Sequence, residues 1–173
     1  LYEYDKGWFY DVDGNRWIDR TLLKFAPETV TRFSIANAST GGQPIVFERN
    51  DNKASWTCSR PPAGRGAVRQ SEGEAFVQRM RWISVQNYKL PIARAGNLAA
   101  MGLLPAEIAL EFTWKDGDAE RTAKIDVGGK VDGDENAHYL TSTEMPFLMT
   151  WPAGMVTQVG LAVAANWVDP EGP

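Results

Sequence analysis

The sequence predicts an α+β domain in which antiparallel strands form meanders and each set of strands is followed by a helix. Apolar residues alternate with polar ones in several short stretches, as they do in half-buried strands. Two other stretches, 71–85 and 153–167, place apolar residues at helical spacing instead. Because strands precede a helix twice, we expect two strand-rich units of similar plan, 1–90 and 91–173, which together can form one compact domain.

Composition narrows the class of protein. Of 173 residues, 43% are hydrophobic and 23% are charged, which suits a chain with a core and excludes a disordered one. The net charge of −4 argues against nucleic acid as a partner, because such binders need a basic face. Cys58 is the single cysteine and His138 the single histidine. An intrachain disulfide and a zinc cluster built on several cysteines or histidines are therefore excluded.

The first unit begins with turn and strand signals. Asp13-Gly14-Asn15 between two aromatic stretches predicts a β-hairpin. Alternation predicts a three-stranded antiparallel meander after it, and two prolines and two glycines then predict a loop over 60–69. The three strands of the meander are expected over 30–36, 45–47 and 56–58.

The helix that closes the first unit is predicted over 71–85. Phe76, Met80 and Ile83 share its apolar side, and Ser71 followed by Glu74 has the spacing of a capping box. The stretch 84–102 is ambiguous, because Pro91 interrupts regular structure and only a short helical turn is indicated near 97–101.

The second unit opens with the clearest alternation in the chain. Ile108, Leu110, Phe112 and Trp114 share one face of a strand over 107–115, and the polar residues between them face water. Further strands are predicted over 121–127, 138–143 and 146–151, joined by polar turns.

A stretch without charged residues runs from Met145 to Val168 and is long enough to span a bilayer. Pro146 and Pro152 interrupt it, so we favour a buried strand followed by a buried helix over 153–167. That helix needs an apolar surface, and we expect it to cover Phe112 and Trp114 and to bury Val159, Val163 and Trp167 itself.

Several polar groups are candidates for chemistry. His138 has Asp132, Asp134 and Ser142 nearby in sequence, as a hydrolase would need, but a structural histidine is the favoured interpretation. The loop 132–136 carries oxygen ligands that suit calcium. It lacks EF-hand spacing, because Thr143 stands where the bidentate glutamate belongs, so a hairpin turn is favoured.

Two further features have a structural interpretation as the default. Gly64-Arg65-Gly66, with Arg60 and Arg69, could cradle a phosphate before the helix, but no Walker or dinucleotide spacing supports this. The seven tryptophans are expected in the core, since a carbohydrate platform needs several exposed side by side. Cys58 is expected to be a small buried residue. We therefore assign no catalytic, cofactor-binding or metal-binding residue and expect no cofactor.

The order of short motifs resembles the domain of unknown function 4340 family. Arg16-Trp17-Ile18-Asp19-Arg20 with Leu22 and Leu23 is similar to its W-x-D-R-x-L opening. The later motifs follow in the family's order, although Thr141 replaces its usual arginine. These motifs are Val30, Phe33 and Ile35; Phe47-Glu48-Arg49; Trp56; Arg60-Pro61-Pro62; Met101-Gly102-Leu103-Leu104-Pro105; Ile125-Asp126-Val127-Gly128; and His138-Tyr139-Leu140.

The resemblance implies a bacterial protein, anchored in the membrane by a segment outside this sequence, with the domain outside the cytoplasm. It also implies an association with transporters of the ATP-binding-cassette kind or with gliding motility, and it brings no enzymatic activity. We therefore expect a non-enzymatic interaction or accessory domain with a protein partner. A module that binds a glycan or cell-wall polymer is the alternative, and a hydrolase built on His138 is a third and weaker one.

Overall fold

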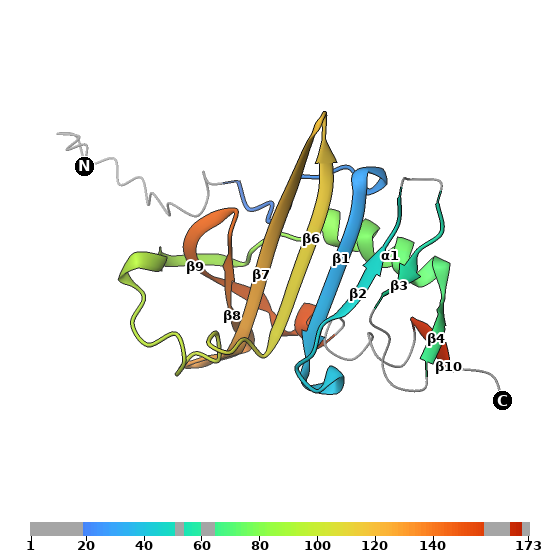
Figure 1. Ribbon diagram of the computed structural model, residues 1–173. Coiled ribbons are helices and arrows are strands. Elements are labelled where there is room, and N and C mark those ends of the chain that lie inside the picture. The colour runs from blue at the N-terminus through green and yellow to red at the C-terminus, as the bar shows by residue number, and fades with distance from the viewer. Residues whose placement is uncertain (1–18, 51–53, 60–64, 158–166, 171–173) are drawn as a thin grey trace.

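A computed structural model describes residues 19–50, 54–59, 65–157 and 167–170 (Figure 1). Most of them lie in antiparallel β-structure, with one helix of 12 residues, α1 (Gln70–Arg81). The strands are β1 (Val30–Asn37), β2 (Ile45–Glu48), β3 (Thr57–Cys58), β4 (Arg65–Val68), β5 (Asn87–Pro91), β6 (Ile108–Asp116), β7 (Ala119–Val131), β8 (Asp134–Ser142), β9 (Met145–Pro152) and β10 (Val168–Pro170). Single 3₁₀ turns are η2 (Pro27–Thr29), η3 (Ala38–Thr40) and η4 (Ile92–Arg94), and residues 153–157 are helical.

Eight of these strands form one sheet in the order β3-β2-β1-β6-β7-β8-β9-β5, in which all neighbours are antiparallel. The predicted α+β class, with a helix after each set of strands, is wrong: the described chain is a mostly-β fold. Its centre is the pairing of β1 with β6, where Phe33 lies opposite Phe112. This pairing joins strands of both predicted units into one sheet. Alternation identifies a strand, but it does not say which distant strand will be its neighbour.

The predicted strands are confirmed. The meander corresponds to β1, β2 and β3, and the later strands correspond to the continuous series β6 to β9. Tight turns with left-handed glycines connect β6 to β7 at Gly117 and β7 to β8 at Gly133. The hairpin predicted at Asp13-Gly14-Asn15 lies outside the described residues.

Helix α1 confirms the predicted apolar spacing. Phe76, Val77 and Met80 are buried on it, and Ile83 is buried just after its end. The predicted capping box is wrong, because the helix begins at Gln70 and no side chain caps it. Glu74 instead binds partners from other segments, which the local spacing could not indicate.

Three strands, β4, β5 and β10, lie where the sequence predicts none. The predicted loop 60–69 contains β4, which pairs with β10, and the ambiguous stretch contains β5, which pairs with β9 at the edge of the large sheet. Neither β4 nor β5 has a regular alternation, so the structure of each depends on the neighbour that supplies its hydrogen bonds. Near 97–101 the chain forms turns, with the Asn97 side chain accepting from the backbone N–H groups of Ala99 and Ala100.

The core lies between α1 and one face of the sheet, behind β1 and β6 in Figure 1. Ile108, Leu110, Phe112 and Trp114 are all buried, which confirms the predicted face of β6. The ring of Phe112 lies 5.7 Å from Phe76 of α1, 5.7 Å from Phe25 and 6.1 Å from Phe33.

These contacts differ from the predicted cover by the helix over 153–167. The described ring neighbours of Phe112 come from α1, β1 and the segment before β1, and Trp114 contacts Phe25. Residues 158–166, with Val159 and Val163, lie outside the described part of the chain. Trp167 is buried as expected, with its ring 4.5 Å from Phe76.

A buried arginine connects the helix to the sheet. Arg49 donates to the backbone oxygens of Val30 at 2.8 Å and Pro27 at 2.7 Å, and it forms an ion pair with Glu74 at 2.5 Å. Its guanidinium lies 4.3 Å from the ring centre of Trp56, and the Trp56 Nε1–H donates to the same Glu74 oxygen at 3.1 Å. The Phe47-Glu48-Arg49 motif therefore ends in a residue that links β1, the segment before it and α1.

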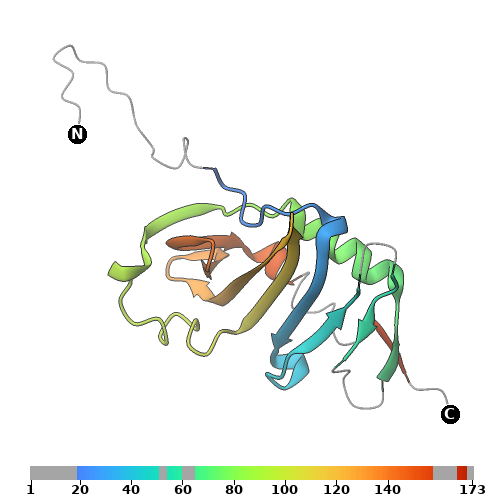
Figure 2. The ribbon, with the colours of Figure 1, turned by 45° about the horizontal axis from the view of Figure 1, so that its top comes forward.

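The long segment between β5 and β6 returns along the end of β7, as Figure 2 shows. The backbone N–H of Gly129 donates to the oxygen of Met101 at 2.8 Å. A Cβ on Gly128 would lie only 2.2 Å from that oxygen, so glycine is required there for the two backbones to approach.

Candidate functional site

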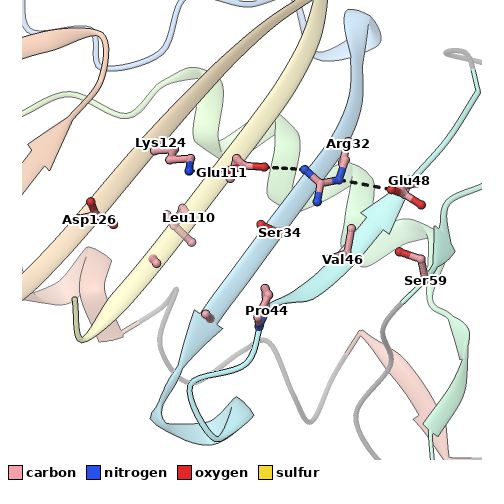
Figure 3. A pocket seen from close by; sticks show the side chains of 12 residues that line it. Arg32, Ser34, Pro44, Val46, Glu48, Ser59, Leu110, Glu111, Lys124 and Asp126 are labelled. Carbon is pink, nitrogen blue, oxygen red and sulfur yellow. Dashed lines mark hydrogen bonds and ion pairs between the residues drawn. The ribbon is translucent and has the colours of Figure 1, made fainter. Parts of the chain in front are cut away.

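The sheet has a second face, opposite α1, which we call the open face. Side chains that alternate with the core residues of β1, β2, β6 and β7 point from it toward the viewer in Figure 3, where α1 lies behind the sheet. They line most of a concavity of about 580 Å³. Its lining comprises Arg32, Ser34, Ala36, Pro44, Val46, Glu48, Ser59, Ala109, Leu110, Glu111, Lys124 and Asp126. Of these, Pro44 and Ser59 lie outside the four strands, and Leu110 is a buried core residue.

Small side chains make this face hollow. Ser34, Ala36 and Ala109 lie on the two central strands, where Ala36 is directly opposite Ala109 and Ser34 opposite Glu111. Longer side chains surround them on the flanking positions, with Lys124 and Asp126 on β7 and Glu48 on β2. A ligand group entering between the longer side chains can therefore approach the backbone of the sheet closely.

The charges of the open face are mostly paired with one another. Arg32 bridges two carboxylates, with its Nη1 2.5 Å from Glu111 and its Nε 3.3 Å from Glu48 (Figure 3). Lys124 lies 3.4 Å from the second oxygen of Glu111. Both cations of the concavity thus share Glu111.

Asp126 differs from these paired charges. It is half-buried, and none of the ion pairs or hydrogen bonds found among the described residues involves its carboxylate. Burial raises the pKa of Asp126, and the positive charge of Lys124 opposes that change only in part. A desolvated carboxylate without a partner in a concave site is a feature typical of functional positions rather than of stabilising ones.

This raised pKa predicts how stability depends on pH. A carboxyl group whose pKa is higher in the folded state binds its proton more tightly when folded, so stability falls as pH rises above the ordinary value of about 3.9. The charged groups that line the same concavity are Lys124 on its own strand, Glu111, Arg32 and Glu48. We expect Asp126→Asn to melt at a higher temperature than the unmodified protein at pH 7, and the difference to shrink toward pH 4.

Asp118→Asn, in the exposed turn between β6 and β7, is the matched control and should show no such pH-dependent difference. Thermal unfolding followed by circular dichroism at several pH values provides the measurement. An Asp126→Asn variant that is less stable than the unmodified protein at pH 7 would contradict the assignment.

His138 lies on β8 and is half-buried. Its Nδ1 is 2.8 Å from the backbone oxygen of Gly128, and this is the hydrogen bond that the structure gives to the ring. Asp134 accepts from the backbone of Asn136, and Ser142 accepts from that of Glu144. Within the described part of the chain, the hydrogen bonds of these residues do not form the arrangement that a hydrolase would need.

The predicted loop 132–136 contains the tight turn between β7 and β8 at residues 132–133, as favoured, and residues 134–136 already belong to β8. Asp132 and Gly133 make the turn, and Glu135 forms an ion pair with Lys130. In the described ranges, no three His, Cys, Asp or Glu side chains come together as metal ligands would. Arg69, from the glycine-containing loop, forms an ion pair with Asp169 at 2.6 Å, whereas Arg60 and Gly64 are among the residues not described.

The described tryptophans are mainly core residues. Trp56, Trp114, Trp151 and Trp167 are buried, whereas Trp82 is 73% exposed beside Arg81. Trp8 and Trp17 lie outside the described residues. Cys58 is only half-buried, so the expectation of a buried cysteine is wrong: it lies on the edge strand β3, which has a neighbour on one side only.

Sequence reasoning did not single out the open face. Arg32, Glu48, Glu111, Lys124 and Asp126 appear in the sequence as ordinary polar positions of half-buried strands. The pairing register places them together, and it joins residues up to 94 positions apart in the chain, from Arg32 to Asp126. One local pattern points to this face: in Ile125-Asp126-Val127 an acidic residue stands between two apolar residues of the core face, so its side chain lies on the opposite face of β7.

The fold and this face define a mostly-β domain in which one face of β1, β2, β6 and β7 packs against the core and the other is concave and charged. Comparisons with family models, with curated proteins and with solved structures find no match to this chain. No helix within the described ranges is long and apolar enough to cross a membrane.

Proposed function

We propose that this chain is a non-enzymatic interaction domain that binds a protein partner over the open face of its sheet. The observation that carries the proposal is the half-buried carboxylate of Asp126, which lies in a concavity without an ion-pair partner while its neighbours are paired. Retaining such a group costs folding stability, and a binding partner that neutralises it supplies a reason for its presence.

The shape of the open face supports a macromolecular ligand. The concavity is open to solvent, it is lined by residues of both charge signs, and its centre is made of small side chains. Polar sheet faces of this kind suit protein contacts, in which charge complementarity selects the partner. The described tryptophans offer no row of exposed rings for a sugar polymer, since Trp82 alone among them is largely exposed.

The setting of this function follows from the resemblance to the domain of unknown function 4340 family. On that basis the domain belongs to a bacterial membrane-anchored protein and works outside the cytoplasm as an accessory to a transport system of the ATP-binding-cassette kind. The anchor would lie outside this sequence.

Photocrosslinking in the cells that produce the protein tests the proposal. Ser59, an exposed residue at the edge of the concavity, is replaced by p-benzoylphenylalanine, and the crosslinked chain is identified by mass spectrometry. Lys115, which is exposed on β6 and does not line the concavity, is the control position. We expect one discrete protein crosslinked from position 59 and not from position 115.

The identified protein is then purified and its affinity measured. Ala109→Trp fills the concavity without entering the core, and we expect it to raise the Kd at least about tenfold, which is 1.4 kcal/mol. Lys115→Trp should leave the Kd unchanged. Equal Kd values for the two variants, or no crosslink from position 59, would contradict an interaction through the open face.

A further inference from the structure

The open face also indicates which chemical group of a partner it recognises, and this inference rests on the proposed function. We infer that the concavity receives a lysine or arginine side chain of the partner protein, with the carboxylate of Asp126 as its counter-ion. The charges and the lining of the concavity favour such a side chain.

The ion pairs within the concavity leave one carboxylate outside them. Three carboxylates and two cations line the concavity, and both cations lie within 3.4 Å of Glu111. Arg32 also reaches Glu48 at 3.3 Å. Asp126 is therefore the carboxylate that an incoming cation can pair with without breaking an existing ion pair.

Access to the Asp126 carboxylate depends on the side chains beside it. Asp126 lies opposite Ala109 on β6, and Ala109 lies opposite Ala36 on β1, so on this side of the carboxylate the row of side chains consists of methyl groups. On the other side Asp126 lies opposite Thr141 of β8. A long aliphatic stem can lie along the row of methyl groups and still place its charged end at Asp126. Lysine and arginine side chains have this combination of an apolar stem and a terminal cation.

The same charges disfavour binding of an anionic group in the concavity. A carboxylate or phosphate entering the concavity would meet the unpaired charge of Asp126, while the cations that could attract it are already shared with Glu111 and Glu48. Like charges at close range in a partly desolvated site oppose binding. The face thus selects a basic segment over an acidic one.

Titration with small probes tests the chemistry directly. The probes are N-acetyl-lysine amide and N-acetyl-arginine amide, with N-acetyl-norleucine amide and N-acetyl-glutamate amide as controls that keep the stem or reverse the charge. Amide chemical shifts of the ¹⁵N-labelled protein report the site. We expect saturable shifts at Ala36, Ala109 and Asp126 with the two cationic probes only.

The variant Asp126→Asn should abolish these shifts, whereas Asp118→Asn, an exposed acidic residue outside the concavity, should keep them. With the crosslinked partner, we expect Asp126→Asn to raise the Kd about tenfold or more, because a charge-assisted hydrogen bond is lost. Raising the salt concentration should weaken binding of the unmodified protein more than that of Asp126→Asn.

The outcomes separate this inference from the proposed function. If Ala109→Trp blocks the partner but Asp126→Asn does not, the open face is the interface and the inferred cation is wrong. If norleucine amide produces the same shifts as lysine amide, or if no probe shifts these residues, the inference also fails. If Ala109→Trp has no effect on the partner, the proposed interface itself is wrong.

Discussion

Replacing Phe112 by alanine is expected to lower the free energy of unfolding by about 3–5 kcal/mol, as large-to-small changes at fully buried aromatic positions do. Phe112 is 0% exposed and lies between rings from three segments: Phe25, Phe33 and Phe76. Its removal therefore leaves a cavity where the sheet, α1 and the segment before β1 meet, and none of these can move inward without disturbing the other two.

Urea unfolding of Phe112→Ala and of Lys115→Ala provides the comparison. Lys115 is on the same strand but exposed, so its truncation should change stability by less than about 0.5 kcal/mol. Equal losses in the two variants would mean that the core face of β6 is assigned incorrectly.

Replacing Arg49 by methionine is expected to lower the free energy of unfolding by roughly 2–4 kcal/mol, because two backbone oxygens and Glu74 lose a charged hydrogen-bond donor. The Arg49 side chain is 1% exposed, and its guanidinium binds the oxygens of Val30 and Pro27 as well as Glu74. Methionine fills a similar volume but removes the side-chain donor from the carbonyl groups of Val30 and Pro27, of which Pro27 keeps the backbone N–H of Val30. Arg49→Lys should recover only part of the loss, since one ammonium cannot reproduce the fork of a guanidinium.

Arg121→Met is the matched control, because Arg121 also forms ion pairs with carboxylates and contacts a tryptophan ring. It pairs with Asp116 at 3.3 Å and Glu144 at 3.2 Å and lies 5.6 Å from the centre of Trp114, but its side chain is 49% exposed. Its loss should cost less than about 1 kcal/mol. An Arg49→Met variant no less stable than Arg121→Met would show that the buried network does not stabilise the fold.

The contacts of Arg49 and Glu74 could not be predicted from the sequence around either residue. Nothing in the residues around Arg49 distinguishes it from an exposed arginine, since its partners come from β1, from the segment before it and from α1. Likewise, Ser71 and Glu74 have capping-box spacing, yet Glu74 pairs with Arg49 and the helix begins without a cap. A local signal of about 1 kcal/mol is outweighed by a buried tertiary contact.

The sequence by itself determined where most strands run, which face of β6 is buried and which side of α1 is apolar, because these depend on residue periodicity within one segment. Tertiary structure decided the strand neighbours, the irregular strands β4 and β5, and the mostly-β class in place of α+β. Tertiary structure also decided the composition of the open face. The register of β1 with β6 places Ala36 opposite Ala109, and the register of β6 with β7 places Asp126 on the other side of Ala109. Register is a relation between distant segments, so the periodicity of one segment cannot specify it.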